Sequence, residues 1–99
     1  MPRPPQVYLV CYDIADPARL RLVYRIMRGY GDGIQKSVFR CELSDRQLAV
    51  MKDRLVTTVK HDEDQVLILH TGAVSSDRSW RAETIGLPLL YPEQVVLVF

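Results

Sequence analysis

The sequence predicts a small α+β sandwich, in which one β-sheet carries two helices on one of its faces. Apolar, β-branched segments alternate with segments of helical periodicity in the order strand, helix, strand, helix, strand. The chain has 99 residues, which is enough for one domain over 1–99 and too few for two. Hydrophobic residues make up 47% and charged residues 25% of the chain, as in ordinary soluble globular proteins.

The first strand and the first helix are predicted in residues 7–30. Residues 7–14 are apolar until Asp13, as in a central strand that is covered on both faces. Asp16 followed by Pro17 is a helix-start signal, because Asp accepts hydrogen bonds at the N-cap and Pro suits the first turn. Apolar residues then recur every three or four positions, which predicts a helix over 17–30 that packs on the sheet. Three glycines are expected to end this helix: Gly29, Gly31 and Gly33.

The middle of the chain predicts a second strand, a second helix and a third strand. Residues 34–43 alternate between two faces after a polar start, and a bend within them would give the βαββαβ order of the ferredoxin-like fold. Ser44 and Gln47 match a capping box ahead of an amphipathic helix over about 45–60. The apolar run 65–71 is predicted as a strand in a covered position.

The C-terminal part predicts association with a second copy of the chain. Residues 72–80 are typical of a loop, 81–86 of a short strand, and 95–99 of an apolar strand that needs a sheet edge to join. In so small a chain, another subunit can supply that edge. Two helices on one face also leave the other face of the sheet without a cover, and a homodimer in which two sheets meet would supply it.

The charges are unevenly distributed along the chain. The net charge is only +1, which argues against a strongly basic nucleic-acid binder. Residues 1–40, however, hold seven basic and three acidic side chains, whereas residues 41–99 carry a net charge of −3. We therefore expect one basic side on the molecule.

Cysteine content and hydropathy favour a cytoplasmic protein. Cys11 and Cys41 are too few for a disulfide scaffold and lack the spacing of a zinc site, so both are expected to be buried as small hydrophobic residues. No apolar run approaches the ~20 residues that span a bilayer. No signal-peptide cleavage pattern follows Met1, and we expect no membrane association.

Asp13 is the strongest candidate for a functional residue. A carboxylate at the carboxyl end of an apolar strand occupies the place where small α/β domains often carry a functional group. Alternatively, it could cap the following turn by accepting backbone N–H groups. One carboxylate is a poor magnesium site, but a two-fold axis near Asp13 would bring a second copy of it to the same ion.

Other polar and aromatic residues have both a functional and a structural interpretation. Arg21, Arg25 and Arg28 recur at i, i+4 and i+7, so they form a basic ridge on the helix, which either faces solvent or binds phosphates. The aromatic side chains on the strands either stack on bases or belong to the core or to a dimer interface. His61 and His70 lack metal-ligand spacing, and no nucleophile triad or phosphate-binding loop is present.

Two motifs carry a resemblance to a known family. The first is Tyr-Asp-Ile at a strand end, followed by an Asp and an Arg-containing helix in YLVCYDIADPARLRLVYRIMRGYG; the second is the Gln-x-Ser-Val-Phe strand in IQKSVFRCEL. Residues 7–71, with DEDQVLIL near their end, resemble the CRISPR-associated protein two family. Its members are the small dimeric, endonuclease-type subunits of spacer acquisition in bacteria and archaea.

This resemblance implies a ferredoxin-like homodimer in which the C-terminal region, 81–99, pairs with the partner subunit's sheet. Asp13 would be the ligand of Mg²⁺ or Mn²⁺ and the catalytic carboxylate, for cleavage of single-stranded RNA or double-stranded DNA. A partner integrase would use the dimer as a scaffold for new spacer DNA. The cleft would be supported by Tyr12, Asp16, Ser37 and Phe39. Nucleic acid would be bound by Arg19, Arg21, Arg25 and Arg28.

The chain departs from the family pattern at two positions. Many relatives carry an arginine where this chain has Gly33, and a tyrosine or similar residue where it has Lys36. The missing arginine removes one group that could stabilise charge in a transition state.

Three functions therefore stay open at this point. The first is a metal-dependent endonuclease, and the second is a non-catalytic dimeric scaffold that holds DNA for the integrase. A small-molecule-binding regulatory domain of the same shape is the third, and it would leave the basic ridge unexplained.

Overall fold

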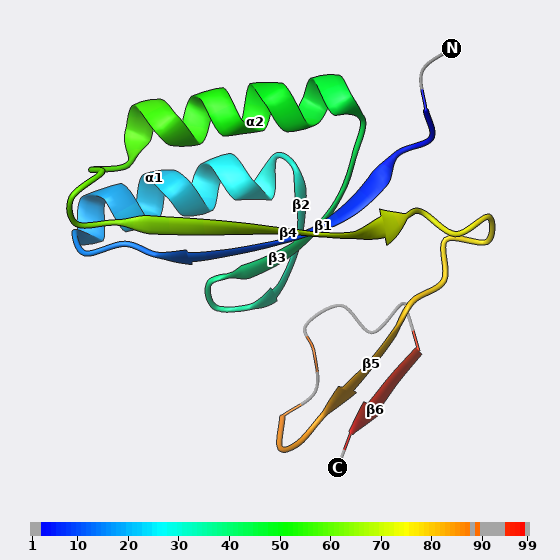
Figure 1. Cartoon of the computed structure of the whole chain (residues 1–99). Coiled ribbons are helices and arrows are strands. Elements are labelled where there is room, and N and C mark those ends of the chain that lie inside the picture. Colours follow the sequence, from blue (N-terminus) through cyan, green and yellow to red (C-terminus); the bar gives the residue numbers. More distant parts are fainter. Residues whose placement is uncertain (1–2, 88, 90–94, 99) are drawn as a thin grey trace.

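A computed structural model of the chain describes residues 3–87, 89 and 95–98. Figure 1 shows the path of the chain through six strands and two helices. They are, in order, β1 (Gln6–Asp13), α1 (Pro17–Arg28), β2 (Gly31–Gln35), β3 (Val38–Leu43), α2 (Asp45–Thr58), β4 (Gln65–Ala73), β5 (Arg81–Thr84) and β6 (Val95–Val98). The predicted segment 34–43 is thus divided by a turn, which gives the βαββαβ order.

The first four strands form one sheet in the order β2-β3-β1-β4, and each neighbouring pair is antiparallel. β3 lies between β1 and β2, and β1 lies between β3 and β4, so each helix joins two strands that are separated by a third. Both helices cover the same face of this sheet (Figure 1). The predicted α+β, ferredoxin-like fold is therefore confirmed. In the described part of the chain, no helix is long and apolar enough to cross a membrane.

The glycines after α1 have a different role from the predicted one. α1 ends at Arg28 with Gly29 as its C-cap, but Gly31 and Gly33 lie within the edge strand β2, which begins three residues before the predicted strand segment 34–43. A Cβ atom on Gly31 would lie 2.5 Å from the carbonyl oxygen of Arg40. Glycine at this position therefore lets β2 lie close against β3. The glycines were predicted to end the helix, so the start of β2 was not recognised in the sequence.

The core lies between the helices and the face of the sheet that they cover. Asp16 caps α1 by accepting from the N–H of Arg19 at 2.9 Å, and Ser44 and Gln47 form the predicted capping box of α2. Both helices then turn their apolar stripes toward the strands. The core residues are Tyr8, Val10, Tyr12, Ile14, Val23, Met27, Phe39, Cys41, Leu43, Met51 and Leu55.

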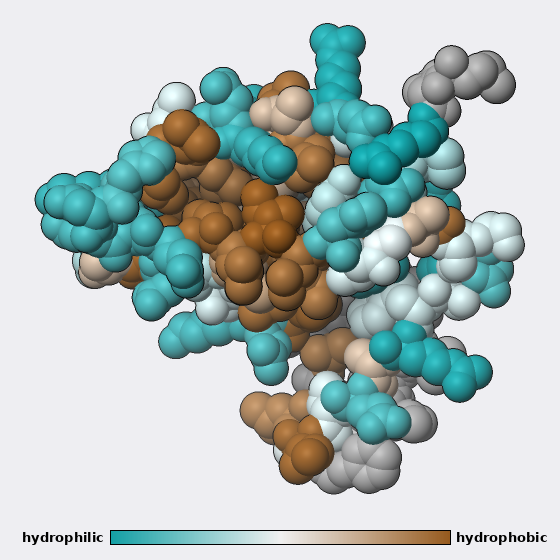
Figure 2. Space-filling view, in the orientation of Figure 1, coloured by the Kyte–Doolittle hydropathy of each residue, from teal (hydrophilic) through white to brown (hydrophobic). Residues whose placement is uncertain are grey.

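The other face of the sheet has no helix over it, so β1 is covered by helices on one face and not on both as predicted, and two further expectations are contradicted. β4 is an edge strand with Leu67 and Leu69 47% and 44% exposed, rather than a covered strand. Leu9 and Cys11 pair with these leucines in register, so all four share this open face, and Cys11 is only half-buried. In Figure 2, hydrophobic side chains gather in the middle of the visible surface, where β4 runs in Figure 1.

The C-terminal strands form a second, two-stranded sheet. β5 and β6 pair in parallel, with Arg81 opposite Val95, and they lie apart from the larger sheet in Figure 1. Both predicted C-terminal strands are present: β5 covers the start of the predicted segment 81–86, and β6 covers 95–98 of the predicted segment 95–99. Residue 99 lies outside the described residues. β6 joins an edge of its own chain here, and the pairing of 81–99 with a second subunit stays a prediction.

Candidate functional site

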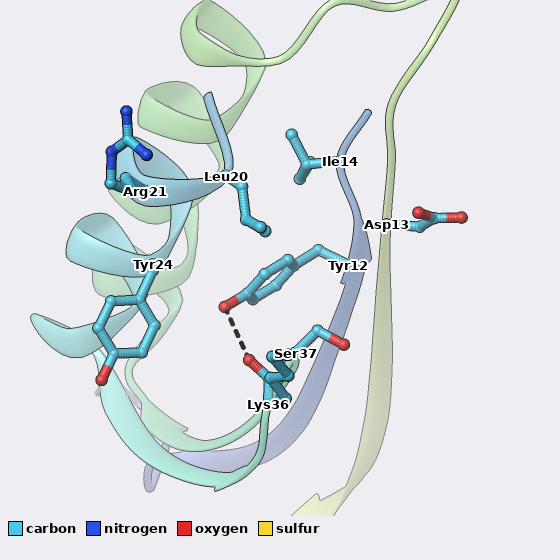
Figure 3. A pocket seen from close by; sticks show the side chains of 8 residues that line it. All are labelled: Tyr12, Asp13, Ile14, Leu20, Arg21, Tyr24, Lys36 and Ser37. Atoms are coloured by element: carbon cyan, nitrogen blue, oxygen red, sulfur yellow. Dashed lines mark hydrogen bonds between the residues drawn. The ribbon is translucent and has the colours of Figure 1, made fainter. Parts of the chain in front are cut away.

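Asp13 is the last residue of β1, and its side chain is exposed. Figure 3 shows its carboxylate on the opposite side of the strand from Tyr12, pointing away from the side chains under α1. The turn-capping interpretation is not supported, because the N–H of Ala15 in that turn donates to Asp64 at 2.9 Å. The structure therefore presents Asp13 as an exposed carboxylate at the carboxyl end of a central strand.

A hollow of about 400 Å³ adjoins Asp13, between α1 and the turn that joins β2 to β3. We call it the α1 hollow. Figure 3 shows Tyr12 extending into it from β1, with Leu20 and Tyr24 on α1 opposite. The Tyr12 hydroxyl donates a long hydrogen bond, 3.5 Å, to the carbonyl of Lys36, and burial raises the pKa of Tyr12. The residues that line the hollow are Tyr12, Asp13, Ile14, Leu20, Arg21, Tyr24, Lys36 and Ser37.

Ser37 and Phe39 stand behind this hollow. The carbonyl of Ser37 accepts from the N–H of Tyr12 at 3.0 Å, which ties the β2–β3 turn to β1. Phe39 is buried, with its ring centroid 6.2 Å from that of Tyr12 and 5.9 Å from that of Tyr24. Both residues therefore hold Tyr12 in place by packing and backbone contact, and Phe39 belongs to the core.

The basic ridge of Arg21, Arg25 and Arg28 is exposed along α1. Within the described residues, none of these three side chains forms an ion pair. Arg21 lines the α1 hollow together with Asp13, and the guanidinium of Arg28 lies 5.9 Å from the ring centroid of Tyr24. Arg21 and Asp13 thus line the same hollow, but their side chains lie on different sides of it in Figure 3.

Arg19 does not join this ridge. Its Nε lies 2.8 Å from Oδ2 of Asp64, and its terminal nitrogen 3.2 Å from Oε1 of Glu63. These bonds raise the pKa of Arg19 and hold the pKa of the Asp64 carboxyl well below its usual range, chiefly through their mutual hydrogen bonds. The guanidinium of Arg19 is therefore neutralised within the chain, and its predicted contact with nucleic acid stays a prediction.

Asp64 is the residue near the site that the sequence analysis missed. Its carboxylate is fully shielded from solvent and accepts from the N–H groups of Ala15 and Lys60, at 2.9 and 2.8 Å, as well as from Arg19. The sequence indicated only a charged turn before β4. The sequence of an acidic turn does not indicate which of its carboxylates faces inward. Asp64 reaches the β1–α1 connection only because of the way the chain folds.

The described residues offer no complete metal site within one chain. They contain no group of three His, Cys, Asp or Glu side chains that could hold an ion. Nε2 of His70 lies 2.8 Å from the amide oxygen of Gln6, and Nε2 of His61 lies 3.2 Å from the carbonyl of Val56. Asp13 supplies hard oxygen donors, which suit Mg²⁺ or Mn²⁺, but any site would need further ligands.

Comparisons with known proteins agree on one family. Residues 6–78 match the family described as CRISPR associated protein Cas2. A protein named CRISPR-associated endoribonuclease Cas2 1, from Rhodospirillum rubrum, is 39% identical over 79 residues, which is 80% of this chain and 76% of that protein.

Two solved structures share the fold of the larger sheet and its helices. The hypothetical protein TT1823 from Thermus thermophilus has a TM-score of 0.66 and 30% identity over 68% of this chain and 82% of that one. Cas2 from Streptococcus pyogenes has a TM-score of 0.63 and 31% identity over 67% and 86% of the two chains.

Proposed function

Because the chain belongs to the CRISPR-associated Cas2 family, we propose that it is a metal-dependent endonuclease that takes part in spacer acquisition and antiviral defence. The observation that carries this proposal is the exposed carboxylate of Asp13 at the end of β1, which lies on the opposite side of the strand from Tyr12. The relative from Rhodospirillum rubrum is named an endoribonuclease, which supports cleavage of RNA. Phosphodiester bonds of single-stranded RNA or double-stranded DNA are the proposed substrates.

The proposed active form is a homodimer. The open face of the sheet carries Leu9, Cys11, Leu67 and Leu69, and two such faces brought together would remove this apolar surface from water. Asp13 lies on the same face of β1 as Leu9 and Cys11, because side chains alternate along a strand. A two-fold axis across this face would therefore bring the two Asp13 carboxylates toward one another.

Two Asp13 carboxylates, one from each subunit, would hold Mg²⁺ or Mn²⁺ together with oxygens of the substrate phosphate. A bound divalent ion supplies charge stabilisation at the phosphate and a lower pKa for an attacking water. The residues of the chain would orient the substrate: the basic ridge binds the phosphates, and Tyr12, Ser37 and Phe39 maintain the wall of the adjoining α1 hollow. Asp16 fixes the start of α1 as its N-cap.

The experiment that tests this proposal compares wild type with Asp13→Asn on single-stranded RNA and on duplex DNA. Each substrate is incubated with Mg²⁺, with Mn²⁺ and with a chelator. Asp53→Asn, an exposed carboxylate on α2, serves as the matched control. We expect cleavage that requires the metal, is lost in Asp13→Asn and is unchanged in Asp53→Asn. Cleavage that survives in Asp13→Asn would assign the activity to other residues.

The second candidate function is a non-catalytic scaffold that holds duplex DNA for the CRISPR-associated integrase. The ridge favours it, because Arg21, Arg25 and Arg28 have no ion-pair partner among the described residues and can neutralise phosphates. Under this alternative, neither wild type nor Asp13→Asn cleaves, and both bind duplex DNA with the same dependence on salt. Replacement of the ridge arginines by Gln would then weaken binding and flatten the salt dependence.

A further inference from the structure

We propose that the α1 hollow binds one unpaired nucleobase of a single-stranded nucleic acid, with the adjacent phosphates on Arg21 and Lys36. This inference rests on the proposed function, because it assumes that nucleic acid is the ligand. It adds a site for a base and a preference for unpaired strands, which neither Asp13 nor the basic ridge provides.

The walls of the hollow suit the faces of a planar ring. Leu20 and Tyr24 remain 39% and 45% exposed on α1, and the hollow is closed by Tyr12 on β1 and by Ile14 directly after β1. Its volume of about 400 Å³ lies within the range of small-molecule sites. In Figure 3, the Tyr12 ring extends from β1 toward α1, which carries the Tyr24 ring. A base between these side chains would gain stacking and apolar contact without any sequence-specific hydrogen bond.

The rim of the hollow has the charge that a nucleotide requires. Arg21 on α1 and Lys36 on the β2–β3 turn both line it, and neither has an acidic partner among the described residues. The Asp13 carboxylate points away from it in Figure 3. An apolar hollow with two cations at its rim is complementary to a base with its phosphates. The paired bases of a duplex cannot enter it, so the ligand must contain an unpaired base.

Tyr24 is held in position before any ligand arrives. Its ring meets Phe39 edge-on at 5.9 Å, and Arg28 lies 5.9 Å from its centroid. A ring held in this way loses little freedom on stacking against a base. We therefore choose Tyr24 as the residue to test, and Leu22 as its control, because Leu22 lies on the same helix, is 47% exposed and does not line the hollow.

The test measures binding of three ligands by the full chain: a short oligothymidylate, an abasic strand of the same length, and a blunt duplex of the same length. Proteins are wild type, Tyr24→Ala, Tyr24→Phe and Leu22→Ala, each checked for folding by circular dichroism and thermal unfolding. We expect Tyr24→Ala to weaken binding of oligothymidylate about 10-fold, as base–aromatic stacking predicts. Its binding of the abasic strand and the duplex should stay within about two-fold of wild type. Tyr24→Phe and Leu22→Ala should resemble wild type on all three ligands.

Two results would overturn the assignment of the hollow. One is an equal loss of affinity for all three ligands in Tyr24→Ala, which would mean that the substitution acts on the fold or on phosphate binding. The other is unchanged affinity of Tyr24→Ala for oligothymidylate while the protein still binds the duplex or shows Asp13-dependent cleavage. In that case the base-binding proposal is wrong and the proposed function stands. Failure of wild type to bind any of the ligands at low salt would contradict both proposals.

Discussion

The side chain of Arg19, in the first turn of α1, meets that of Asp64, in the α2–β4 turn 45 residues later, with Nε of Arg19 2.8 Å from Oδ2 of Asp64. The same carboxylate accepts from the N–H of Ala15, two residues after Asp13. Asp64 therefore fixes both the path of the chain that leaves β1 and the first turn of α1. The candidate catalytic residue is thus positioned from the α2–β4 turn, which is remote from it in sequence.

Low pH should weaken the contact between Arg19 and Asp64 and lower the stability of the fold. Hydrogen bonds from Arg19 keep the pKa of Asp64 below its usual value of about 4. A carboxyl whose pKa is lowered by folding stabilises the native state above its unfolded pKa, and this contribution is lost as pH falls through the folded value. We expect Asp64→Asn to be less stable than wild type at neutral pH and to lose less stability between neutral pH and about pH 3.

Urea unfolding over a pH series measures this difference, with Asp53→Asn as an exposed carboxylate control. The control should follow the wild-type profile. An acid profile of Asp64→Asn that is parallel to wild type would show that the Asp64 carboxylate does not supply the pH-dependent part of the stability.

A methyl group added at Gly31 should lower the free energy of unfolding far more than one added at Gly33. In Gly31→Ala the added Cβ would lie 2.5 Å from both the Arg40 carbonyl oxygen and Sγ of Cys41, so β2 would have to move away from β3. At Gly33 the nearest atoms belong to the Phe39 ring at 3.5 Å, which is ordinary contact. We expect Gly31→Ala to lower the free energy of unfolding by about 1–3 kcal/mol, and Gly33→Ala to change it by less than about 1 kcal/mol.

Chemical denaturation of the two variants under identical conditions makes this comparison. Equal stability of Gly31→Ala and Gly33→Ala would contradict the close approach of β2 to β3 at Gly31.

The two thiols should differ in reactivity. Cys41 is fully buried, and burial raises the pKa of its thiol to about 12, so almost no thiolate is present near neutral pH. Cys11 is half-buried on the open face. At a protein concentration low enough to dissociate the proposed dimer, a thiol reagent at pH 8 should therefore label only Cys11 in the folded chain, and Cys11→Ser should remain unlabelled until denaturant is added. Mass spectrometry of the labelled peptides identifies the site, and rapid labelling of Cys41 would contradict this assignment.

A charge on the open face should prevent the proposed dimer. Leu69 on β4 and Val50 on α2 are both 44% exposed, but only Leu69 lies on the face without helices. Because two apolar faces would associate over Leu69, Leu69→Asp should leave the chain monomeric, whereas Val50→Asp should behave as wild type. Sedimentation velocity over a concentration series measures this. Association of Leu69→Asp at wild-type affinity would place the interface elsewhere.

The elements that were predicted correctly depend on local signals. Asp16 before Pro17 and Ser44 with Gln47 mark the helix starts that the structure contains, because capping bonds form within one turn. The start of β2 was assigned to the end of the helix because Gly31 is required by a contact with β3, which no local pattern reveals. β4 was assigned a covered position because its leucines are apolar, and an apolar strand has the same composition whether its own chain or another covers it.

The sequence by itself determined the α+β class, the helix starts and the placement of Asp13 at a strand end, because each follows from the period and chemistry of adjacent residues. It also identified the basic ridge, since i, i+4 spacing fixes one helix face. Only the tertiary structure decided which cations have acidic partners. Arg19 meets Asp64, whereas Arg21 borders a hollow with Tyr12 and Lys36, and both outcomes depend on residues that the sheet topology brings together from distant positions.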